Sequence, residues 1–366
     1  TDYCGGCAQV SIELGGEPFQ ASEVFLQRLS LYDAECTIVG LDVRIRCFLS
    51  AAADILSLEV DDQRAHPQPV HVTVSMWRPP VVQTGAHQAM YRFRDASDHV
   101  LLVQQFDEHD HHCASGVAAA ILGPDVQVEE TSERARTLVS PQRQGETEIL
   151  VTSSASWCRQ VDAADAALHL LEQASGQACN IRRQEHSRWW SGFWSRTFVH
   201  LTSTDGNADF MERIRTLHLY AMAATSRGML PPKWNGSLFI TDGDIRRWGA
   251  QFWVWTTEMH YFPLLAADAI DLTEPYFDMY LKQLPDCLRA GSQRWGAEGA
   301  FYAETTPFDG PVILPDDIGA EFQDVYLGRK SSLQFSERAR ALGQYDCSLR
   351  VLAGAEKELA AGRYTW

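Results

Sequence analysis

The stretch MLPPKWNGSLFITDGDIRRWGAQFWVWTTEMHYFP, Met229–Pro263, gives the strongest local signal in the chain. Its first half holds prolines, an asparagine, glycines and aspartates, and its second half is rich in tryptophan and contains a Glu, a His and a Tyr near its end. Turn-forming residues predict a surface loop, and such loops carry a large share of binding and catalytic side chains. The stretch therefore predicts a loop of site residues that leads into a helix over Arg247–Asp268.

Two faces of this predicted helix differ in character. Spacings of three and four residues connect an apolar stripe that we expect in the core, formed by Trp248, Phe252, Trp255, Met259 and Phe262. A second face holds Gln251, Val254, Glu258 and Tyr261. A carboxylate on an apolar helix is costly unless it is paired, so Glu258 is interpreted either as a buried hydrogen-bond partner or as a sugar ligand. His260 fits a core position and a sugar contact equally well.

The chain beyond Ala208 has a helical pattern. Helices are predicted over Phe210–Thr225, Glu274–Arg289 and Phe335–Ala361, and the loops between them contain Gly, Pro and Asp. This pattern predicts stacked helical hairpins whose loops gather at one end.

The first part of the chain, by contrast, is a series of short β-favouring runs. Strands are predicted at Val10–Leu14, Val24–Leu31, Thr37–Leu49, Ile55–Val60, Val70–Trp77, Gln88–Phe93, Val100–Phe106 and Ile149–Thr152. Several runs alternate apolar and polar residues, which is typical of strands with one packed and one wet face. Together they predict a large antiparallel sandwich. The strand–helix–strand rhythm of a nucleotide-binding α/β sheet is missing.

Two further helices are predicted between these regions, over Val161–Ala174 and Ile181–Arg196. The second carries aromatic residues on more than one side, namely Trp189, Trp190, Phe193 and Trp194. A helix that is apolar on several faces is enclosed by other structure, so we interpret it as a linker wedged between domains. The sequence thus predicts a β-sandwich domain over residues 1–155, a helical linker over 156–206 and a helical domain over 207–366.

Composition limits the class of partner. The 48 acidic residues against 31 Lys and Arg give a net charge of −17, whereas binding to nucleic acid requires a basic surface. A neutral small ligand fits better, and the eleven Trp and eleven Tyr offer flat faces suited either to sugars or to core packing. No apolar run is long enough to span a membrane, and the first residues lack the order of a signal peptide, so the compartment stays open.

Two short clusters resemble metal-binding motifs. Cys4-Gly-Gly-Cys7 is the one CxxC among nine cysteines, and it lacks the second pair of a zinc ribbon. Every residue of Asp107–Cys113 is a potential ligand, but adjacent residues point in different directions, so we interpret this segment as a polar loop. The sequence predicts neither a metal site nor a cofactor.

Five local strings carry a family resemblance. They are FLQRLSLYDA (Phe25–Ala34), RCFLS (Arg46–Ser50), His186–Val199, LPPKWNG (Leu230–Gly236) and EMHYFP (Glu258–Pro263). In this order, and with a sandwich before helical hairpins, they resemble the six-hairpin (α/α)6-barrel glycosidases, nearest glycoside hydrolase family 95 and its less characterised relatives. The resemblance implies a multidomain β + α fold, with an N-terminal antiparallel β-supersandwich, linker helices and an (α/α)6 barrel.

Departures from the family limit what the resemblance implies. Family 95 has an Asn-x-Asn pair before its Glu-Met that helps to position the attacking water, whereas Val254 and Thr256 occupy these positions here. The resemblance therefore implies the fold without an α-fucosidase activity. GAFYAET (Gly299–Thr305) resembles a string of the related family 65 phosphorylases, whose Glu lines the sugar subsite and whose general acid comes from a later hairpin. Residues 208–366 cover about half of a six-hairpin barrel, so we expect an incomplete barrel and a general acid beyond Trp366.

Glycoside hydrolysis requires two carboxylates in one cavity. Candidates occur at Asp242, Asp244, Glu258, Glu304, Asp309, Asp316, Asp317 and Glu321. We predict Glu304 as the ligand-contacting or acid/base carboxylate, with Asp242 or Asp244 as the second. Predicted substrate contacts are Asn235, Trp248, Glu258, His260 and Tyr261. The expected function is a glycoside hydrolase that acts on an oligo- or polysaccharide by acid/base catalysis with inversion.

Two other functions stay open. A polysaccharide lyase would neutralise a uronate and abstract its C5 proton with the residue types found at Asn235, Arg246, His260 and Tyr261, although lyases place the sandwich after the helical toroid. A non-catalytic carbohydrate-binding relative would suit the replaced Asn pair. A carbohydrate is the expected partner in each case, and the oligomeric state is open.

Overall fold

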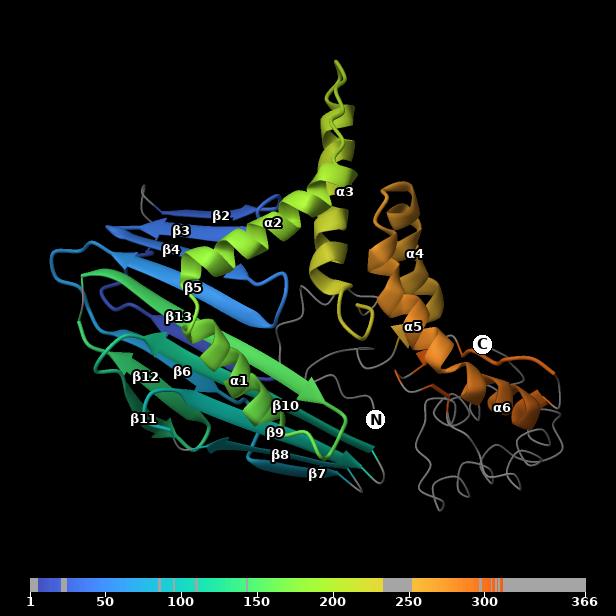
Figure 1. The fold of residues 1–366 in the computed structure, drawn as a ribbon, viewed down its shortest axis with the longest axis horizontal. Coiled ribbons are helices and arrows are strands. Elements are labelled where there is room, and N and C mark those ends of the chain that lie inside the picture. The colour runs from blue at the N-terminus through green and yellow to red at the C-terminus, as the bar shows by residue number, and fades with distance from the viewer. Residues whose placement is uncertain are drawn as a thin grey trace, which may run out of the picture. The chain divides into compact units, whose positions relative to one another are not determined.

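The structure is a computed structural model that describes residues 6–20, 25–84, 87–94, 96–108, 111–142, 144–232, 252–295, 298–303, 305–306, 308 and 310–311. Contacts divide the chain into two compact units, Gly5–His200 and a second unit that begins at Leu201. An antiparallel β region followed by helices confirms the predicted fold class (Figure 1).

Two antiparallel sheets make up the first unit. A four-stranded sheet has the order β1 (Gln9–Glu13), β6 (Val70–Ser75), β12 (Ala135–Ser140) and β11 (Gln127–Ser132). A nine-stranded sheet has the order β2 (Leu26–Ser30), β3 (Glu35–Gly40), β4 (Val43–Leu49), β5 (Ile55–Asp62), β13 (Gly145–Ser156), β10 (His111–Leu122), β9 (Val100–Glu108), β8 (His87–Arg94) and β7 (Val81–Thr84). The main core lies between these sheets, where alternating residues such as Val72 and Val74 are fully buried.

Strands β7, β11 and β12 of the first unit were not predicted from the sequence. β7 has only four residues, and β11 is polar and almost entirely exposed, which is atypical of strands. The single strand expected over Thr37–Leu49 is instead the hairpin β3–β4, which turns at Leu41 and Asp42. Asp42 has a φ of 51°, a left-handed conformation that Asp tolerates better than most residues.

Helix α1 (Ala163–Ser175) packs on the outer face of the nine-stranded sheet (Figure 1). Its contact face is built mainly from alanines, which let the helix approach the strands closely. At Gly116 on β10, a Cβ atom would lie 2.2 Å from the carbonyl oxygen of Ala163, so only glycine fits beneath the start of α1. The Asp162 side chain caps the helix by accepting from the backbone N–H groups of Ala164 and Asp165.

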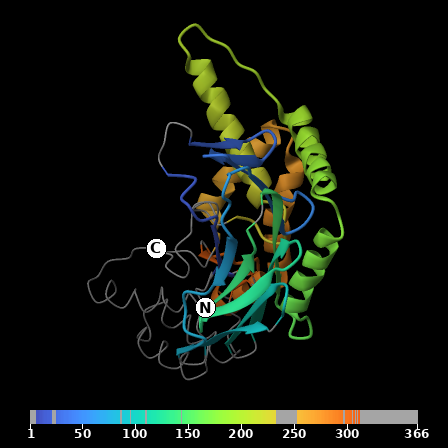
Figure 2. The same ribbon diagram turned by 90° about the vertical axis from the view of Figure 1, so that its left-hand side faces the viewer.

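Helix α2 (Cys179–Thr197) follows on the same side of the strands, as Figure 2 shows. Arg182, with a side chain 3% exposed, forms an ion pair with Glu148 of β13. Arg183 pairs with Glu35 of β3 and with Glu59 of β5. Since buried charges are tolerated only when paired, these contacts fix the position of α2 along the strands.

The contacts of α2 also explain the three N-terminal strings of the family resemblance. His186 Nε2 donates to the carbonyl oxygen of Asp33 at 2.9 Å, and Trp194 Nε1 donates to that of Leu31 at 3.2 Å. The ring of Phe48 lies 5.0 Å from that of His186, between centroids. The strings that contain these residues therefore contact one another and serve the architecture of the first unit.

Helices form most of the described part of the second unit. They are α3 (Asn207–Thr225), α4 (Val254–Ala266), the 3-10 helix η2 (Ile270–Thr273), α5 (Glu274–Lys282) and α6 (Leu284–Trp295). A two-stranded ladder pairs β14 (Phe252–Trp253) with β15 (Thr305–Thr306). None of the helices in the described ranges is both long and apolar enough to cross a membrane.

Three predicted helices of this unit differ from the structure or lie outside the described residues. The helix expected to start at Arg247 begins at Val254, because Phe252 and Trp253 are taken up by the β14–β15 ladder. The helix expected over Glu274–Arg289 is divided into α5 and α6 at Gln283. The helix expected over Phe335–Ala361 lies outside the described residues.

The prediction that this apolar stripe lies in the core was wrong for the two stripe residues of α4 whose exposure is described. Met259 and Phe262 are 43% and 57% exposed. The buried face of α4 is formed instead by Thr257, Tyr261 and Leu264, of which Thr257 and Leu264 are fully buried. Sequence periodicity identifies apolar stripes but cannot tell which stripe a neighbouring helix covers.

Candidate functional site

The predicted site residues divide into two sets. Asn235, Asp242, Asp244, Trp248 and Glu304 lie outside the described residues. Glu258, His260 and Tyr261 all lie on α4. The described part of the candidate site is therefore α4 together with the elements that contact it and the segment that carries β15.

Tyr261 has defined partners within the fold. Its hydroxyl lies 2.9 Å from Ser226 Oγ, and Ser226 Oγ donates to the carbonyl oxygen of Leu272 at 2.7 Å. Because the serine has one proton to give, Tyr261 is the donor in the first bond. Burial raises the pKa of Tyr261, so the hydroxyl stays protonated. Tyr261 thus ties α4 to the end of α3 and to η2, and its predicted sugar contact stays a prediction.

His260 faces helix α3. Its ring is stacked on that of His218, with centroids 6.4 Å apart and planes inclined by 19°. Burial and the neighbouring His260 lower the pKa of His218, and the buried Nε2 of His218 has no hydrogen-bond partner in the described part of the chain. His218 was not singled out in the sequence, because a lone histidine within a helix gives no periodic signal.

Glu258 and His260 do not converge on one point. Successive residues of an α-helix are about 100° apart, so two residues separate these side chains by about 200° around α4. Both are half-buried and flank the face that holds Thr257 and Leu264. A ligand that contacted both side chains would have to extend around the helix, so we expect one of them at most in direct contact with a single sugar ring.

The segment around β15 is held on α5 and α6 by main-chain contacts. The N–H of Phe301 donates to the carbonyl oxygen of Cys287 at 2.8 Å, and the hydroxyl of Tyr302 donates to that of Tyr280 at 3.0 Å. A Cβ on Gly291 would lie 2.3 Å from the carbonyl oxygen of Gly299, so a glycine is required at this approach. The chain before β15 is therefore closely attached to the helices.

Gln283 fixes the same segment beyond β15. Its side chain is buried, accepts from Thr306 Oγ1 at 3.4 Å, and donates from Nε2 to the carbonyl oxygen of Phe308 at 3.2 Å. A buried amide that satisfies two partners holds its segment in one position. Sequence reasoning missed Gln283, since it placed the residue inside a continuous helix.

The β14–β15 ladder brings together the two stretches that the sequence singled out. Thr305 pairs with Trp253, and Thr306 pairs with Phe252, directly before α4 begins. Glu304 precedes Thr305 in the sequence, so the ladder joins the string that contains Glu304 to the stretch Met229–Pro263. Trp253 and Thr305 are 52 positions apart in the chain (305 minus 253), and no local pattern predicts their pairing.

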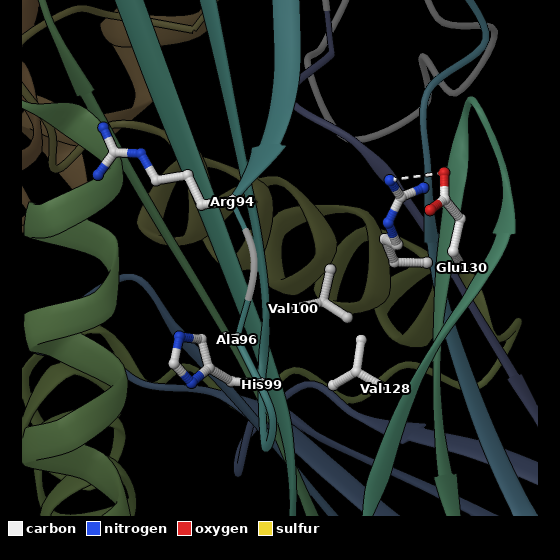
Figure 3. Close-up of a pocket in the computed structure, with 7 residues that line it drawn as sticks. Arg94, Ala96, His99, Val100, Val128 and Glu130 are labelled. Carbon is white, nitrogen blue, oxygen red and sulfur yellow. Dashed lines mark ion pairs between the residues drawn. The ribbon is translucent and has the colours of Figure 1, made fainter.

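A small cavity in the first unit is a weaker candidate (Figure 3). It measures about 130 Å³, less than the several hundred Å³ typical of ligand pockets. Its lining residues are Arg94, Ala96, His99, Val100, Val128, Glu130 and Arg136. Arg94 points away from Val100 and Val128 in Figure 3 and pairs with Asp162, the N-cap residue of α1, and with Asp165 of α1, so its charge serves the α1 contact.

The described residues of the Asp107–Cys113 cluster lie at strand ends where the sequence suggested a polar loop. Asp107 lies in β9, and His112 lies opposite it in β10. Burial raises the pKa of Asp107, but hydrogen bonds from His112 and Arg159 outweigh this effect and hold the pKa below its usual value. Among the described residues, no three His, Cys, Asp or Glu side chains group as metal ligands.

Comparison with known proteins identifies the fold. No protein-family model and no curated protein matches the sequence of this chain. A solved structure described as a kojibiose phosphorylase from the human microbiome is similar over 88% of this chain, with a TM-score of 0.57 and 10% identity. A family GH92 glycosyl hydrolase matches over 94% of this chain at 14% identity, with a TM-score of 0.41. The chain spans 46% and 48% of the length of these structures.

Proposed function

We propose that this protein is part of a carbohydrate-active enzyme of the glycosidase type, which hydrolyses O-glycosidic bonds of an oligo- or polysaccharide. The observation that carries the proposal is the β14–β15 ladder, which joins the string ending in Glu304-Thr305 to the start of α4. The similarity to the phosphorylase structure supports the sandwich-plus-helices fold on which such sites occur.

The proposed chemistry assigns different roles to the carboxylates. Glu304 contacts the substrate or exchanges a proton with it, and Asp242 or Asp244 acts as the second carboxylate. An inverting enzyme holds the two carboxyl groups about 6.5–9.5 Å apart, which leaves room for the attacking water. Sugar hydroxyls are bound by polar and aromatic side chains, which we assign to Asn235, Trp248, Glu258, His260 and Tyr261.

We further propose that α3 to α6 belong to the first half of a helical barrel, within the predicted domain over residues 207–366. The chain covers 46% of the phosphorylase structure that it resembles, which supports a general acid outside this chain. Large apolar side chains on the outer faces of α3 and α4 support the same proposal, because further helices would cover them.

Phosphorolysis is a second candidate, favoured by the resemblance of GAFYAET to family 65 and by the fold similarity to the phosphorylase. In this reaction phosphate replaces water as the nucleophile, so one proton-donating carboxylate is enough. The two reactions therefore differ in their need for a second carboxylate and for phosphate.

The test is an assay of the full chain, alone and within a longer polypeptide, on a panel of disaccharides with and without inorganic phosphate. Free reducing sugar in the absence of phosphate supports hydrolysis, and a sugar 1-phosphate supports phosphorolysis. An ultraviolet-absorbing unsaturated product would instead identify a lyase, and binding without turnover a non-catalytic relative.

The site assignment is tested with Glu304→Gln. We expect a loss of about 10²–10⁴-fold in kcat, the usual contribution of a positioned acid or base. Glu274→Gln is the matched control, because Glu274 is an exposed carboxylate in the first turn of α5. Undiminished turnover by Glu304→Gln would eliminate Glu304 from the mechanism.

A further inference from the structure

Two cysteines face each other in the first unit. Cys36 on β3 lies directly opposite Cys47 on β4 in the antiparallel pairing of these strands. Opposed residues of an antiparallel pair project to the same face of the sheet. Two positions along, the opposed pair Ile38 and Ile45 contributes to the core between the sheets, and Cys47 packs against that core as well. Both thiols are half-buried, so they share one environment on the inner face of the nine-stranded sheet.

The backbone geometry of this pair is compatible with a covalent bond. Opposed residues have Cα atoms about 4.5–5.5 Å apart. Disulfides span about 4.4–6.8 Å between Cα atoms. The two ranges overlap, so ring closure requires rotation of the two side chains and little movement of β3 or β4. The Cys36 thiol lies close enough to Cys47 to contribute to the raised pKa of the Cys47 thiol.

We propose that Cys36 and Cys47 form a cross-strand disulfide when the protein meets a small-molecule disulfide such as oxidised glutathione. The β3–β4 hairpin is thereby a redox modification site. The other described cysteines serve as internal comparisons for this oxidation. Among the described cysteines, Cys158 has the exposed thiol.

The reaction balances as two thiol–disulfide exchanges. The Cys36 thiolate attacks one sulfur of oxidised glutathione, and a glutathione thiolate leaves. The Cys47 thiolate then attacks the Cys36 sulfur of the mixed disulfide and releases the second glutathione thiolate. The protein loses two protons and two electrons, and one molecule of oxidised glutathione is reduced to two molecules of glutathione.

The environment of Cys47 sets the pH dependence of the second step. Burial, followed by the neighbouring Cys36, raises the pKa of Cys47 to about 11. The Cys47 thiolate is therefore scarce at neutral pH, and its fraction rises about tenfold for each unit of pH below that value. We expect ring closure to accelerate steeply between about pH 7 and pH 9.

The crosslink would lie beside the attachment of α2. The neighbouring opposed pair is Glu35 and Phe48. The Glu35 carboxylate forms an ion pair with Arg183 at 3.2 Å, and the ring of Phe48 packs on that of His186. A covalent bond one position away would restrict the unfolded chain and hold these two strands together, so it stabilises the part of the sheet to which α2 is attached.

The test uses the full chain, incubated with oxidised glutathione, blocked with N-ethylmaleimide and digested with trypsin without reduction. Cleavage after Arg28, Arg44, Arg46 and Arg64 places each thiol in its own peptide, 29–44 and 47–64. We expect these two peptides to be linked, with a mass two hydrogens below the sum of the reduced peptides. The linkage should raise Tm by several degrees, and dithiothreitol should reverse both changes.

Cys36→Ser should abolish the linked peptide and the Tm shift, whereas the matched control Cys158→Ser should retain both. A Cys36→Ala variant provides a second test with a smaller apolar side chain if the serine variant is poorly folded. The proposal is overturned if peptides 29–44 and 47–64 stay unlinked while Cys158 becomes glutathionylated. It is also overturned if Cys47 pairs with another cysteine in the wild-type chain.

Discussion

Helices α2 and α3 have the same length but opposite surroundings. Both span 19 residues. Helix α2 buries its aromatic residues, with Trp190 and Phe193 each 2% exposed, and places its arginines on carboxylates of the strands. Helix α3 leaves large apolar residues between 48% and 58% exposed, namely Phe210, Met211, Ile214 and Leu217. The helices of the first unit therefore have their packing partners within the chain, whereas α3 has partners on only part of its surface.

The contrast between α2 and α3 shows two different reasons why a helix carries apolar residues. On α2 they pack on strands of the same unit, and the helix contributes to the stability of that unit. On α3 and α4 several large apolar residues are exposed, and contiguous exposed apolar surface often marks a face that other structure covers. The proposed completion of the barrel is consistent with this contrast, which three substitutions can break or sharpen.

The largest effect is expected from Arg182→Met. It leaves the Glu148 carboxylate without its buried partner, which costs about 3–5 kcal/mol of the free energy of unfolding. Urea denaturation of the full chain measures the loss. Arg188→Met is the matched control on an exposed position of α2, where we expect a change within about 0.5 kcal/mol. Equal losses in the two variants would show that the ion pair does not anchor α2.

A second variant of the same pair sharpens this prediction. Replacement of both partners, Arg182→Met with Glu148→Leu, removes the unpaired charge and should recover most of the lost stability. A double variant as unstable as Arg182→Met alone would assign the loss to packing of the long arginine side chain.

An intermediate effect is expected from Gln283→Met in the second unit. The substitution keeps the side-chain volume but removes the amide hydrogen bonds to the Phe308 carbonyl and the Thr306 hydroxyl, at about 1–3 kcal/mol. Because Gln283 holds the segment that follows Glu304, catalytic activity should fall together with stability. Lys282→Met, at an exposed position one residue earlier, should change neither. Full activity in the Gln283 variant would remove this segment from the site.

The smallest effect is expected from Phe262→Ser on the exposed face of α4. In this chain the free energy of unfolding should change by less than about 0.5 kcal/mol, since the ring is already 57% exposed. In a polypeptide that carries the complete barrel, the same substitution should cost about 3–5 kcal/mol. Chemical denaturation of both proteins measures the difference. A large loss in the present chain would contradict the exposed position of Phe262.

The sequence was a reliable guide wherever the signal is local. Alternation at Val70–Ser75 predicts β6, and the Ala/Leu-rich pattern predicts α1 to within two residues at its start and one at its end. The strand and helix patterns likewise predicted a β-sandwich that precedes helices. The family strings suggested site residues on α4, and three of these are described: Glu258, His260 and Tyr261.

Errors arose where a residue's environment depends on a distant segment. Met259 and Phe262 have the spacing of a core stripe, yet α4 packs through Thr257, Tyr261 and Leu264. Asp107 and His112 are polar residues typical of a loop, yet they pair across β9 and β10. Neither feature leaves a periodic trace in the sequence.

Sequence alone determined the fold class of this protein, an acidic chain with a β-sandwich before helices, and it contains strings that resemble those of barrel glycosidases. Tertiary structure decided which residues meet. In the folded chain, Trp253 pairs with Thr305, Ser226 is hydrogen-bonded to Tyr261, and Cys36 lies opposite Cys47. The physical reason is that periodicity and turn chemistry act over a few residues, whereas pairing register and burial are set by contacts between segments far apart in the chain.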